Sequence, residues 1–418
     1  MADAIPGDVV QVKLVADKNR YADGEIIEIV TPSPMRGKSP CPVSKECGGC
    51  TWLEVDYQQQ LEWKVGFVRS ALERIGKLPV GADISITPSP QVLHYRNRIH
   101  LKAHVRPDGK LSVGYYRRGS TNLVAISNCA ISHPSINALL AGLTSKDVQP
   151  SLPNLGPEDF KIEIQHLPAA TTPEQRDLLV TVFPEKHETK LLAPLLAWLA
   201  AHPSVAWSGL SFDRDRCAPI LFETFSATDK SPKLLMQGLP GQFQQVNTAA
   251  NGQLRARVYG MIQAIAPKRL LDVCSGSGNL SLGLASPTCY VEGIENNPAA
   301  IASARVNVQA NGRQNATYLR GDSEAHLWKC AKKGEKFDAV ILDPPREGFY
   351  RGLVPLKKIS PDHIIYVSCD PATLARDIGA LCRSEYEVAE VHAYDFFPNT
   401  WHVESLVRLR KKVVPQRL

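Results

Sequence analysis

The C-terminal part of the chain alternates short apolar strands with amphipathic helices, and this pattern constrains the fold more than any other feature. From about Asn247 onward, each short apolar run is followed by a turn and then by apolar residues at helical spacing. The expected strands cover residues 269–273, 290–294, 316–320, 337–342 and 363–368. Strands that alternate with helices predict a parallel, doubly wound α/β sheet, which binds its ligands at the carboxyl ends of its strands.

The loop after the first of these strands has the composition of a nucleotide-binding turn. It has the sequence LDVCSGSGN over residues 271–279, and the next strand ends at Glu295, where a carboxylate can accept hydrogen bonds from ribose hydroxyls. The loop lacks the complete G-x-G-x-x-G of a dinucleotide site, and no P-loop lysine follows it. We therefore expect a single-nucleoside ligand such as S-adenosylmethionine. Asp322 follows the third strand, where it can meet an adenine amino group or cap the next helix.

Two further strand ends carry residues suited to chemistry. The fourth strand leads into Asp343-Pro344-Pro345, and the fifth ends at Cys369, just before an Asp-Pro pair that can start a helix. A helix start lowers a thiol pKa, which favours a nucleophile at Cys369; the alternative is a small buried side chain. Glu404 precedes an apolar strand at 405–409, where it is either a rim residue or a general base for that thiol.

Four of the ten cysteines have the spacing of metal ligands. Cys41, Cys47 and Cys50 form a close trio, and Cys129 lies far downstream. Spacing alone leaves a cubane iron–sulfur cluster and a tetrahedral zinc ion equally open. The start of the chain has no signal-peptide pattern, so we expect a reducing cytoplasm, and no apolar run approaches the roughly 18 residues of a membrane span.

The N-terminal half is predicted to be mainly β-structure with a basic segment. Residues 8–30 alternate as a small β module, 57–75 and 190–201 have helical spacing, and 94–126 and 160–183 are β-rich. The net charge is only +6, but seven cations oppose one Asp between residues 94 and 120. These cations, together with three tyrosines, predict an RNA-binding face, the alternative being a solvated sheet. The cations are Arg96, Arg98, Lys102, Arg106, Lys110, Arg117 and Arg118, and the tyrosines are Tyr95, Tyr115 and Tyr116.

Taken together, these residues resemble the RNA 5-methyluridine methyltransferase family, and specifically its iron–sulfur-containing 23S ribosomal RNA branch. The resemblance extends over nearly the whole chain, from residue 41 to residue 406. The matching motifs are CPVSKECGGC at 41–50, YRNRIHL at 95–101, FQQVN at 243–247, LDVCSGSGNLSL at 271–282, GIE at 293–295, RGD at 320–322, DPPREG at 343–348, YVSCDPATLARD at 366–377 and FFPNTWHVESL at 396–406.

The resemblance implies a role for each matched residue. Cys369 is the expected nucleophile, which adds to C6 of uracil, and Glu404 the expected base, which removes the C5 proton. Phe243 and Phe397 are candidates to flank a base splayed out of its stack, or else core residues. The expected S-adenosylmethionine contacts are Gln245, Cys274, Asn279, Glu295, Asp322 and Asp343. The expected ligands of a [4Fe–4S] cluster are Cys41, Cys47, Cys50 and Cys129.

The family also implies a domain order and a substrate. We expect a partial TRAM-like, OB-type β module at 1–38, a β-rich iron–sulfur and RNA-binding domain at 39–242, and a Rossmann-like methyltransferase domain at 243–418. The sequence departs from the usual family pattern at Cys274, where an aromatic residue is common, at Asp370, where Asn is common, and at Asn399, where His is common. A cytoplasmic monomer that methylates 23S ribosomal RNA is expected. The alternatives are methylation of the transfer RNA T-loop and an inactive iron–sulfur RNA-binding protein.

Overall fold

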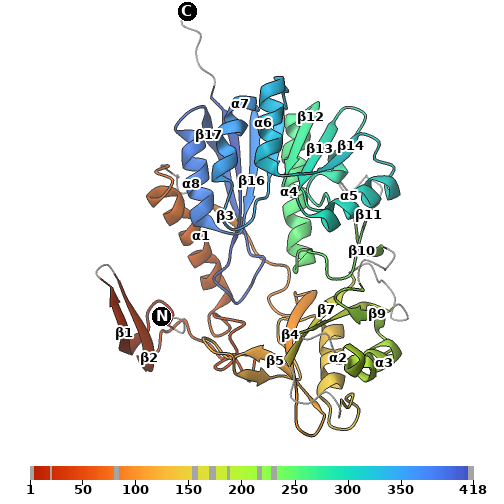
Figure 1. The fold of residues 1–418 in the computed structure, drawn as a ribbon. Helices are drawn as coiled ribbons and strands as arrows, with labels where there is room; N and C mark the ends of the chain where they lie inside the picture. Colours follow the sequence, from red (N-terminus) through yellow and green to blue (C-terminus); the bar gives the residue numbers. More distant parts are fainter. Residues whose placement is uncertain are drawn as a thin grey trace, which may run out of the picture.

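The computed structural model of the chain contains two principal β-sheets, a β-hairpin and an N-terminal ribbon (Figure 1). It describes residues 4–18, 21–79, 84–152, 159–168, 176–185, 189–213, 219–226 and 233–412. Among these residues, no helix is both long and apolar enough to cross a membrane.

The larger sheet has eight strands and contains the alternating pattern of the C-terminal sequence. Five of its strands are parallel, and they confirm the five predicted strands. The sheet is mixed, however, because β18 runs antiparallel between β16 and β17, and β3 pairs with the outer side of β17. The order is β14 (Ala316–Arg320), β13 (Tyr290–Glu295), β12 (Arg269–Val273), β15 (Ala339–Leu342), β16 (His363–Ser368), β18 (Glu404–Lys411), β17 (Tyr386–Tyr394) and β3 (Ser85–Thr87).

Helices cover both faces of this sheet, and two separate hydrophobic clusters fill the two interfaces. The central strand β15 is buried at all four positions, as expected of a parallel strand covered on both sides. Several helices begin at a side-chain cap, such as Asp370 for α8 and Asn297 for α5. The helices are α4 (Thr248–Ile265), α5 (Pro298–Ala310), α6 (Ser323–Lys333), α7 (Leu353–Ile359) and α8 (Pro371–Cys382).

Helix α1 (Tyr57–Arg74) also belongs to this layer, although it lies far upstream in the sequence. It packs against α8, and Val68 and Leu72 are fully buried in the same cluster as residues of β15 and β16. Helix α1 and strand β3 both fall in the range 39–242 that was predicted as the central domain. In the structure they belong to the eight-stranded sheet and its helical layer instead (Figure 1).

The second sheet has six strands and its own hydrophobic cluster, to which α2 (Pro134–Thr144) and α3 (Ala193–Ala201) contribute. It confirms the β-rich character predicted for 94–126 and 160–183. Its order is β6 (Leu123–Ala125), β5 (Leu111–Tyr116), β4 (Arg98–Val105), β7 (Asp159–His166), β8 (Leu178–Pro184) and β9 (Val205–Leu210). A separate hairpin of β10 (Ile220–Ser226) and β11 (Lys233–Gly238) lies against α5.

The N-terminal module is a two-stranded ribbon and not a barrel. Strands β1 (Val9–Lys18) and β2 (Tyr21–Thr31) pair only with each other and extend away from the rest of the molecule (Figure 1). Val9, Leu14 and Ile27 are each more than half exposed. The described residues of this segment therefore do not form a closed OB-like barrel.

Candidate active site

The pairing of β16 with β18 places Cys369 and Glu404 next to each other. Ser368 is the register partner of Ser405 in this antiparallel pair. Cys369 follows Ser368 and Glu404 precedes Ser405, so the two side chains come from facing positions at one end of the pair. Glu404 is only 4% exposed, and its charge raises the pKa of the Cys369 thiol. Two residues that are distant in the sequence thus form one site.

Two more acids lie at the same edge of the sheet. Asp343 follows β15, and its amide donates to the Val273 oxygen at the end of β12. Glu295 ends β13, and its Oε2 accepts from the Gly276 amide at 3.1 Å. Burial and the Glu295 charge raise the pKa of Asp343 to about 7. Burial and the Asp343 charge hold the pKa of Glu404 well above its usual range. The edge therefore carries more negative charge than it can hold without a cation.

The thiol of Cys369 differs from expectation in its pKa. The helix start is confirmed, because Asp370 caps α8, but burial raises the pKa of Cys369, and the charges of Glu404 and Asp343 add to this. A hydrogen bond and the positive charge of Arg346 oppose the increase without cancelling it. Arg346 lies within the DPPREG motif, yet no pattern in the sequence marks it for a role.

The glycine-rich loop follows β12 as predicted. Cys274 adopts a left-handed φ of 62° and Gly278 one of 88°. A Cβ on Gly278 would stand 2.7 Å from the Tyr318 hydroxyl, so both the backbone angle and the space favour glycine. Burial raises the pKa of Cys274 to about 12, and its sulfur lies 3.7 Å from the Ser323 hydroxyl. This thiol is a neutral group on the loop.

The other residues expected to contact the cofactor lie around the same loop but have protein partners. The Asn279 amide exchanges hydrogen bonds with Asn251 at 3.0 Å in both directions. Asp322 caps α6, as the alternative interpretation predicted, by accepting from the Ala325 amide at 2.8 Å. The Gln245 main-chain oxygen accepts from Asn97. Direct roles for these three side chains stay predictions.

The four cysteines predicted as metal ligands line one cavity. Cys41, Cys47, Cys50 and Cys129 face it together with apolar side chains such as Val43, Leu53 and Ile131. Burial, followed by the charge of Cys129, raises the pKa of Cys50 to about 12. Burial likewise raises the pKa of Cys41 and Cys47, so these three thiols favour the neutral form unless a cation binds them.

Four thiols that line one cavity are a donor set that fits a zinc ion or an iron–sulfur cluster. Tetrahedral zinc with sulfur ligands holds its thiolates about 3.8 Å apart. Among the described residues, groups of three ligand atoms within 4.8 Å of one another occur elsewhere, but no such trio occurs within this set of cysteines. Arg96 also lines the cavity, and its Nε is buried without a hydrogen-bond partner. A cation beside the cavity suits a cluster with net negative charge.

One of the other groups does not have the geometry of a metal site. His133, His166 and Asp177 place ligand atoms within 4.8 Å of one another. The two imidazole rings, however, stack with centroids 3.6 Å apart and planes only 20° apart. Because imidazole lone pairs lie in the ring plane, two stacked rings cannot direct them at one ion.

The basic segment of the central domain is partly internal, which corrects the expectation that it faces RNA throughout. Arg98 is buried and donates to the main-chain oxygens of Gln242 and Gln244. Arg117 pairs with Glu46 at 2.6 Å, and Arg118 donates to the Cys50 oxygen. Much of this charge therefore holds the cysteine segment and the 243–247 segment in place.

The two aromatic residues expected to flank a base differ in exposure. Phe243 is 72% exposed, with the Arg98 guanidinium 5.7 Å from its ring centre. Phe397 is half-buried and packs against the hydrophobic cluster that contains Phe396. Of the two, Phe243 is the residue with a free aromatic face.

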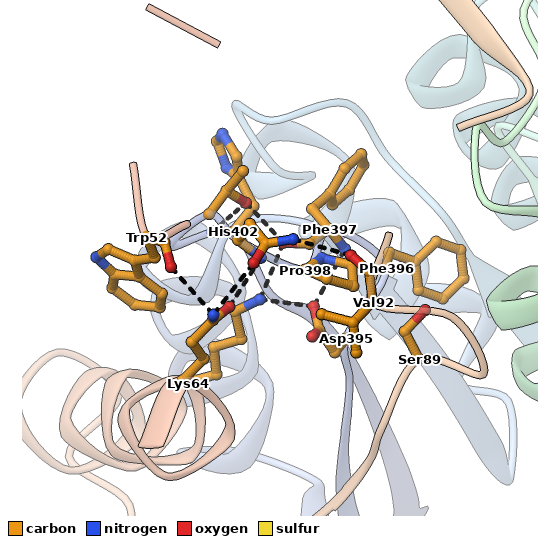
Figure 2. Close-up of polar contacts among 12 residues, drawn as sticks. Trp52, Lys64, Ser89, Val92, Asp395, Phe396, Phe397, Pro398 and His402 are labelled. Atoms are coloured by element: carbon orange, nitrogen blue, oxygen red, sulfur yellow. Dashed lines mark hydrogen bonds and ion pairs between the residues drawn. The ribbon is translucent and has the colours of Figure 1, made fainter. Parts of the chain in front are cut away.

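A buried ion pair that the sequence did not predict supports the segment before Glu404. Lys64 on α1 bonds Asp395 at 2.6 Å, and both side chains are fully buried (Figure 2). The Lys64 ammonium also donates to the Phe397 oxygen at 3.0 Å. Nothing in the helical pattern of 57–75 distinguishes this lysine from a solvent-exposed one.

The sheet, its glycine loop and the acidic edge define the class of the protein as an α/β S-adenosylmethionine-dependent methyltransferase fold. The structure is similar to that of Pyrococcus abyssi tRNA (uracil-54, C5)-methyltransferase, which was solved with S-adenosyl-L-homocysteine. The TM-score is 0.64 at 23% identity, over 97% of this chain and 94% of that one.

Sequence comparison narrows this class. The family model of tRNA (uracil-5-)-methyltransferase matches residues 220–412. An uncharacterized RNA methyltransferase of Thermosynechococcus vestitus is 33% identical over 98% of this chain and 92% of the relative. Another, from a Nostoc species, is 32% identical over 96% of this chain and 89% of the relative. The chain belongs to the RNA uracil-5-methyltransferase family.

Proposed function

We propose that the protein transfers a methyl group from S-adenosylmethionine to C5 of a uridine in RNA. The observation that carries this proposal is the facing pair of Cys369 and Glu404, at the same sheet edge as Asp343 and Glu295. A nucleophile, a base and acids that can hold a cationic nucleoside are the groups that this reaction needs.

The roles of the two facing residues follow from the chemistry of uracil. C5 is a poor nucleophile until the Cys369 thiolate adds at C6, which moves the electron pair of the C5–C6 double bond toward O4. C5 can then form a bond to the methyl group of S-adenosylmethionine, while the carbon–sulfur bond breaks and its electron pair stays on the sulfur, which becomes neutral. Glu404 takes the proton from C5, the double bond re-forms, and the thiolate leaves.

The acidic edge suits this donor. Burial and the charge of Glu295 disfavour the charged form of Asp343 when no cation lies beside it. A sulfonium and an amino group offset that repulsion, and Glu295, at the end of β13, is placed to accept from ribose hydroxyls. We assign Asp343 and Glu295 as principal contacts, with Gln245, Cys274, Asn279 and Asp322 around them.

We propose a [4Fe–4S] cluster in the cysteine cavity. The four thiols that line the cavity and the buried Arg96 beside them support such a cluster. Such a group would fix the fold of the 41–52 segment and needs no redox step. Purified protein with broad visible absorption and about four irons per chain is expected; a colourless protein with stoichiometric zinc would overturn it.

We propose 23S ribosomal RNA as the substrate, within the cytoplasm and by a monomer. Cysteines at all four positions of the iron–sulfur branch support this choice. Transfer RNA is the second candidate, because the similar Pyrococcus abyssi structure is that of a tRNA methyltransferase. Mapping 5-methyluridine in ribosomal and transfer RNA from cells that lack the protein tests both. Loss from ribosomal RNA alone is expected.

A catalytically inactive iron–sulfur RNA-binding protein is the remaining alternative. Labelled methyl transfer to total RNA separates it from an enzyme, because a binding protein would transfer no label. The presence of both Cys369 and Glu404 at the edge favours the enzyme.

A further inference from the structure

The segment that leads into Glu404 is held by residues from the N-terminal third of the chain. This segment, residues 395–403, connects β17 to β18 and is called the 395–403 loop below. Its main-chain oxygens accept hydrogen bonds at Phe397 from Lys64 and at Pro398 from the Tyr95 hydroxyl. The loop thus depends on segments far from it in sequence for its shape (Figure 2).

Asn399 is the most heavily bonded residue of the 395–403 loop. Its main-chain amide donates to Gln60 Oε1 at 2.7 Å, its Nδ2 donates to the Val92 oxygen at 2.8 Å, and its Oδ1 accepts from Gln60 Nε2. It is 4% exposed and has a left-handed φ of 65°, which Asn tolerates better than most residues. The side chain therefore holds the main chain in an unusual conformation.

The main-chain oxygen of Asn399 meets the cysteine segment directly. It accepts from the amides of Thr51 and Trp52, at 3.1 and 3.0 Å. Thr51 follows Cys50, whose side chain lines the cysteine cavity. A second set of contacts also joins the loop to the cavity. The Tyr95 hydroxyl donates to the Pro398 oxygen, and the next residue, Arg96, lines the cavity.

The other end of the 395–403 loop is the proposed base. Glu404 is the first residue of β18 and the register partner of Tyr394, so the loop closes between two paired residues. Only residues 400–403 separate Asn399 from Glu404, so the conformation at Asn399 bears directly on the chain that leads into Glu404. A base acts only when it lies within hydrogen-bond reach of its proton.

The cysteine segment is anchored to residues 116–118, through the Gly48 amide, the Glu46 carboxylate and the Cys50 oxygen. Residues 41–50 form turns without a helix, and one isolated bridge joins Cys47 to Arg117. Ligation of four thiols by one metal group cross-links this segment to Cys129, which the side chain of Asn137 holds at both main-chain atoms. Occupation of the cavity should therefore fix the position of Thr51 and Trp52.

We propose that Asn399 is a positioning residue that joins the cysteine cavity to Glu404, so that the occupied cavity sets the rate of C5 proton removal. The identity of the affected step, removal of the C5 proton, rests on the proposed function. The mechanical link between the cavity and the 395–403 loop does not, and it can be measured without RNA.

Hydrogen exchange of the full chain tests the link. Protein reconstituted with iron and sulfide is compared with the same protein after removal of iron by a chelator. Peptides that cover the 395–403 loop and residues 51–52 should exchange faster after removal, while β12 and β15 keep their protection. Equal exchange in the loop, or loss of protection across the whole eight-stranded sheet, would overturn the proposal.

Substitution of Asn399 tests the step. Asn399→Gly allows the left-handed backbone and keeps the main-chain bond to Gln60 Oε1, but it removes the side-chain bonds to Gln60 Nε2 and to the Val92 oxygen. Asn399→Asp restores the shape and the Oδ acceptor. Asn399→Gly should slow release of the methylated RNA by about 10- to 100-fold, part of the 10²–10⁴ that a positioned base contributes. Formation of the covalent adduct should change little, and Asn399→Asp should recover part of the rate.

A matched control separates this effect from general destabilisation. Asn311 also bridges main-chain atoms through its amide, at Leu235, but lies at the end of α5. Asn311→Ala should leave adduct release unchanged. Equal slowing of adduct formation and release by Asn399→Gly would contradict a positioning role. If the unmodified protein does not methylate RNA, the proposed function is wrong. The exchange experiment then still decides whether the cysteine cavity and the 395–403 loop are linked.

Discussion

Lys64 and Asp395 form an ion pair in which neither side chain is exposed, although 331 positions separate them in the sequence. The pair joins α1 to the first residue of the 395–403 loop. The charge of Asp395 opposes the effect of burial on Lys64, whose pKa is nevertheless lowered. Removal of either partner leaves a buried charge without compensation.

Lys64→Met should therefore lower the free energy of unfolding by about 3–5 kcal/mol. Chemical denaturation followed by circular dichroism measures this change. The exposed Lys332 serves as control, since Lys332→Met should cost less than about 0.5 kcal/mol. A double substitution with Asp395→Leu should recover part of the loss, because it removes the orphaned carboxylate. Equal costs for Lys64→Met and Lys332→Met would show that the pair contributes nothing.

Cys369→Ala should abolish methyl transfer, because C5 of uracil is not activated without an adduct at C6. The variant should still bind S-adenosylmethionine, since Cys369 lies beside the acids and does not supply their charge. Isothermal calorimetry and transfer of labelled methyl groups measure the two properties separately. Normal turnover in this variant would show that the nucleophile lies elsewhere.

Glu404→Gln should permit adduct formation and methyl transfer but stall release, because the amide cannot accept the C5 proton. A protein–RNA adduct that survives a denaturing gel is the expected observation. Glu390, at the pairing of β17 with β18, offers a control away from the edge. If Glu404→Gln releases its product at the normal rate, another residue is the base.

Cys50→Ser should reduce iron content and visible absorption of the purified protein. Cys289 is a free, buried cysteine far from the cavity, so Cys289→Ser should retain both. Metal analysis of the two variants in parallel is the test. An unchanged iron content in Cys50→Ser would remove Cys50 from the ligand set.

The contribution of Asp343 to stability in the absence of ligand should decrease as pH rises from about 4 to 7. The folded chain holds a proton on Asp343, whose pKa is about 7, after the unfolded chain has lost it at its ordinary value of 3.8. A state that binds more protons is destabilised as pH increases. Asp343→Asn should therefore lose less stability than the original chain between pH 5 and pH 8.

Comparison of the Asp343→Asn variant with the original chain at each pH removes the contributions to stability that both proteins share. Buried histidines such as His166 and His402, with pKa values lowered to about 4, act in the opposite direction in both. Melting temperatures at pH 5 and pH 8, without and with S-adenosylmethionine, provide the measurement. Parallel pH profiles for the two proteins would show that Asp343 is ionised throughout.

The local patterns of the C-terminal half were sufficient to predict five strands and the position of the acids, because periodicity and turn residues act over short distances. The same reasoning could not place α1 and β3 on that sheet, since their contacts with α8 and β17 are made at long range. The resemblance placed Glu404 near Cys369, and the register of β18 supplies the physical reason.

The site itself was predicted unevenly for a related reason. Cysteine spacing predicted a group of four cysteines, and these line one cavity. Arg96 and Arg98, predicted to face RNA, are instead held inside by the segments that they support. No sequence pattern marked Arg346, Lys64 or Gln60 for a role, because the role of a single polar residue depends on the residues that it contacts in the fold.

The antiparallel placement of β18 between β16 and β17 has a consequence for the order of assembly. Among the described strands, β18 is the last to be synthesised, yet it fills a gap between two earlier ones. Until it enters, β16 presents an unpaired edge and Cys369 has no neighbouring carboxylate. Closure of that gap both completes the sheet and brings Glu404, the proposed base, beside Cys369, the proposed nucleophile. A growing chain therefore cannot assemble this pair before β18 is inserted.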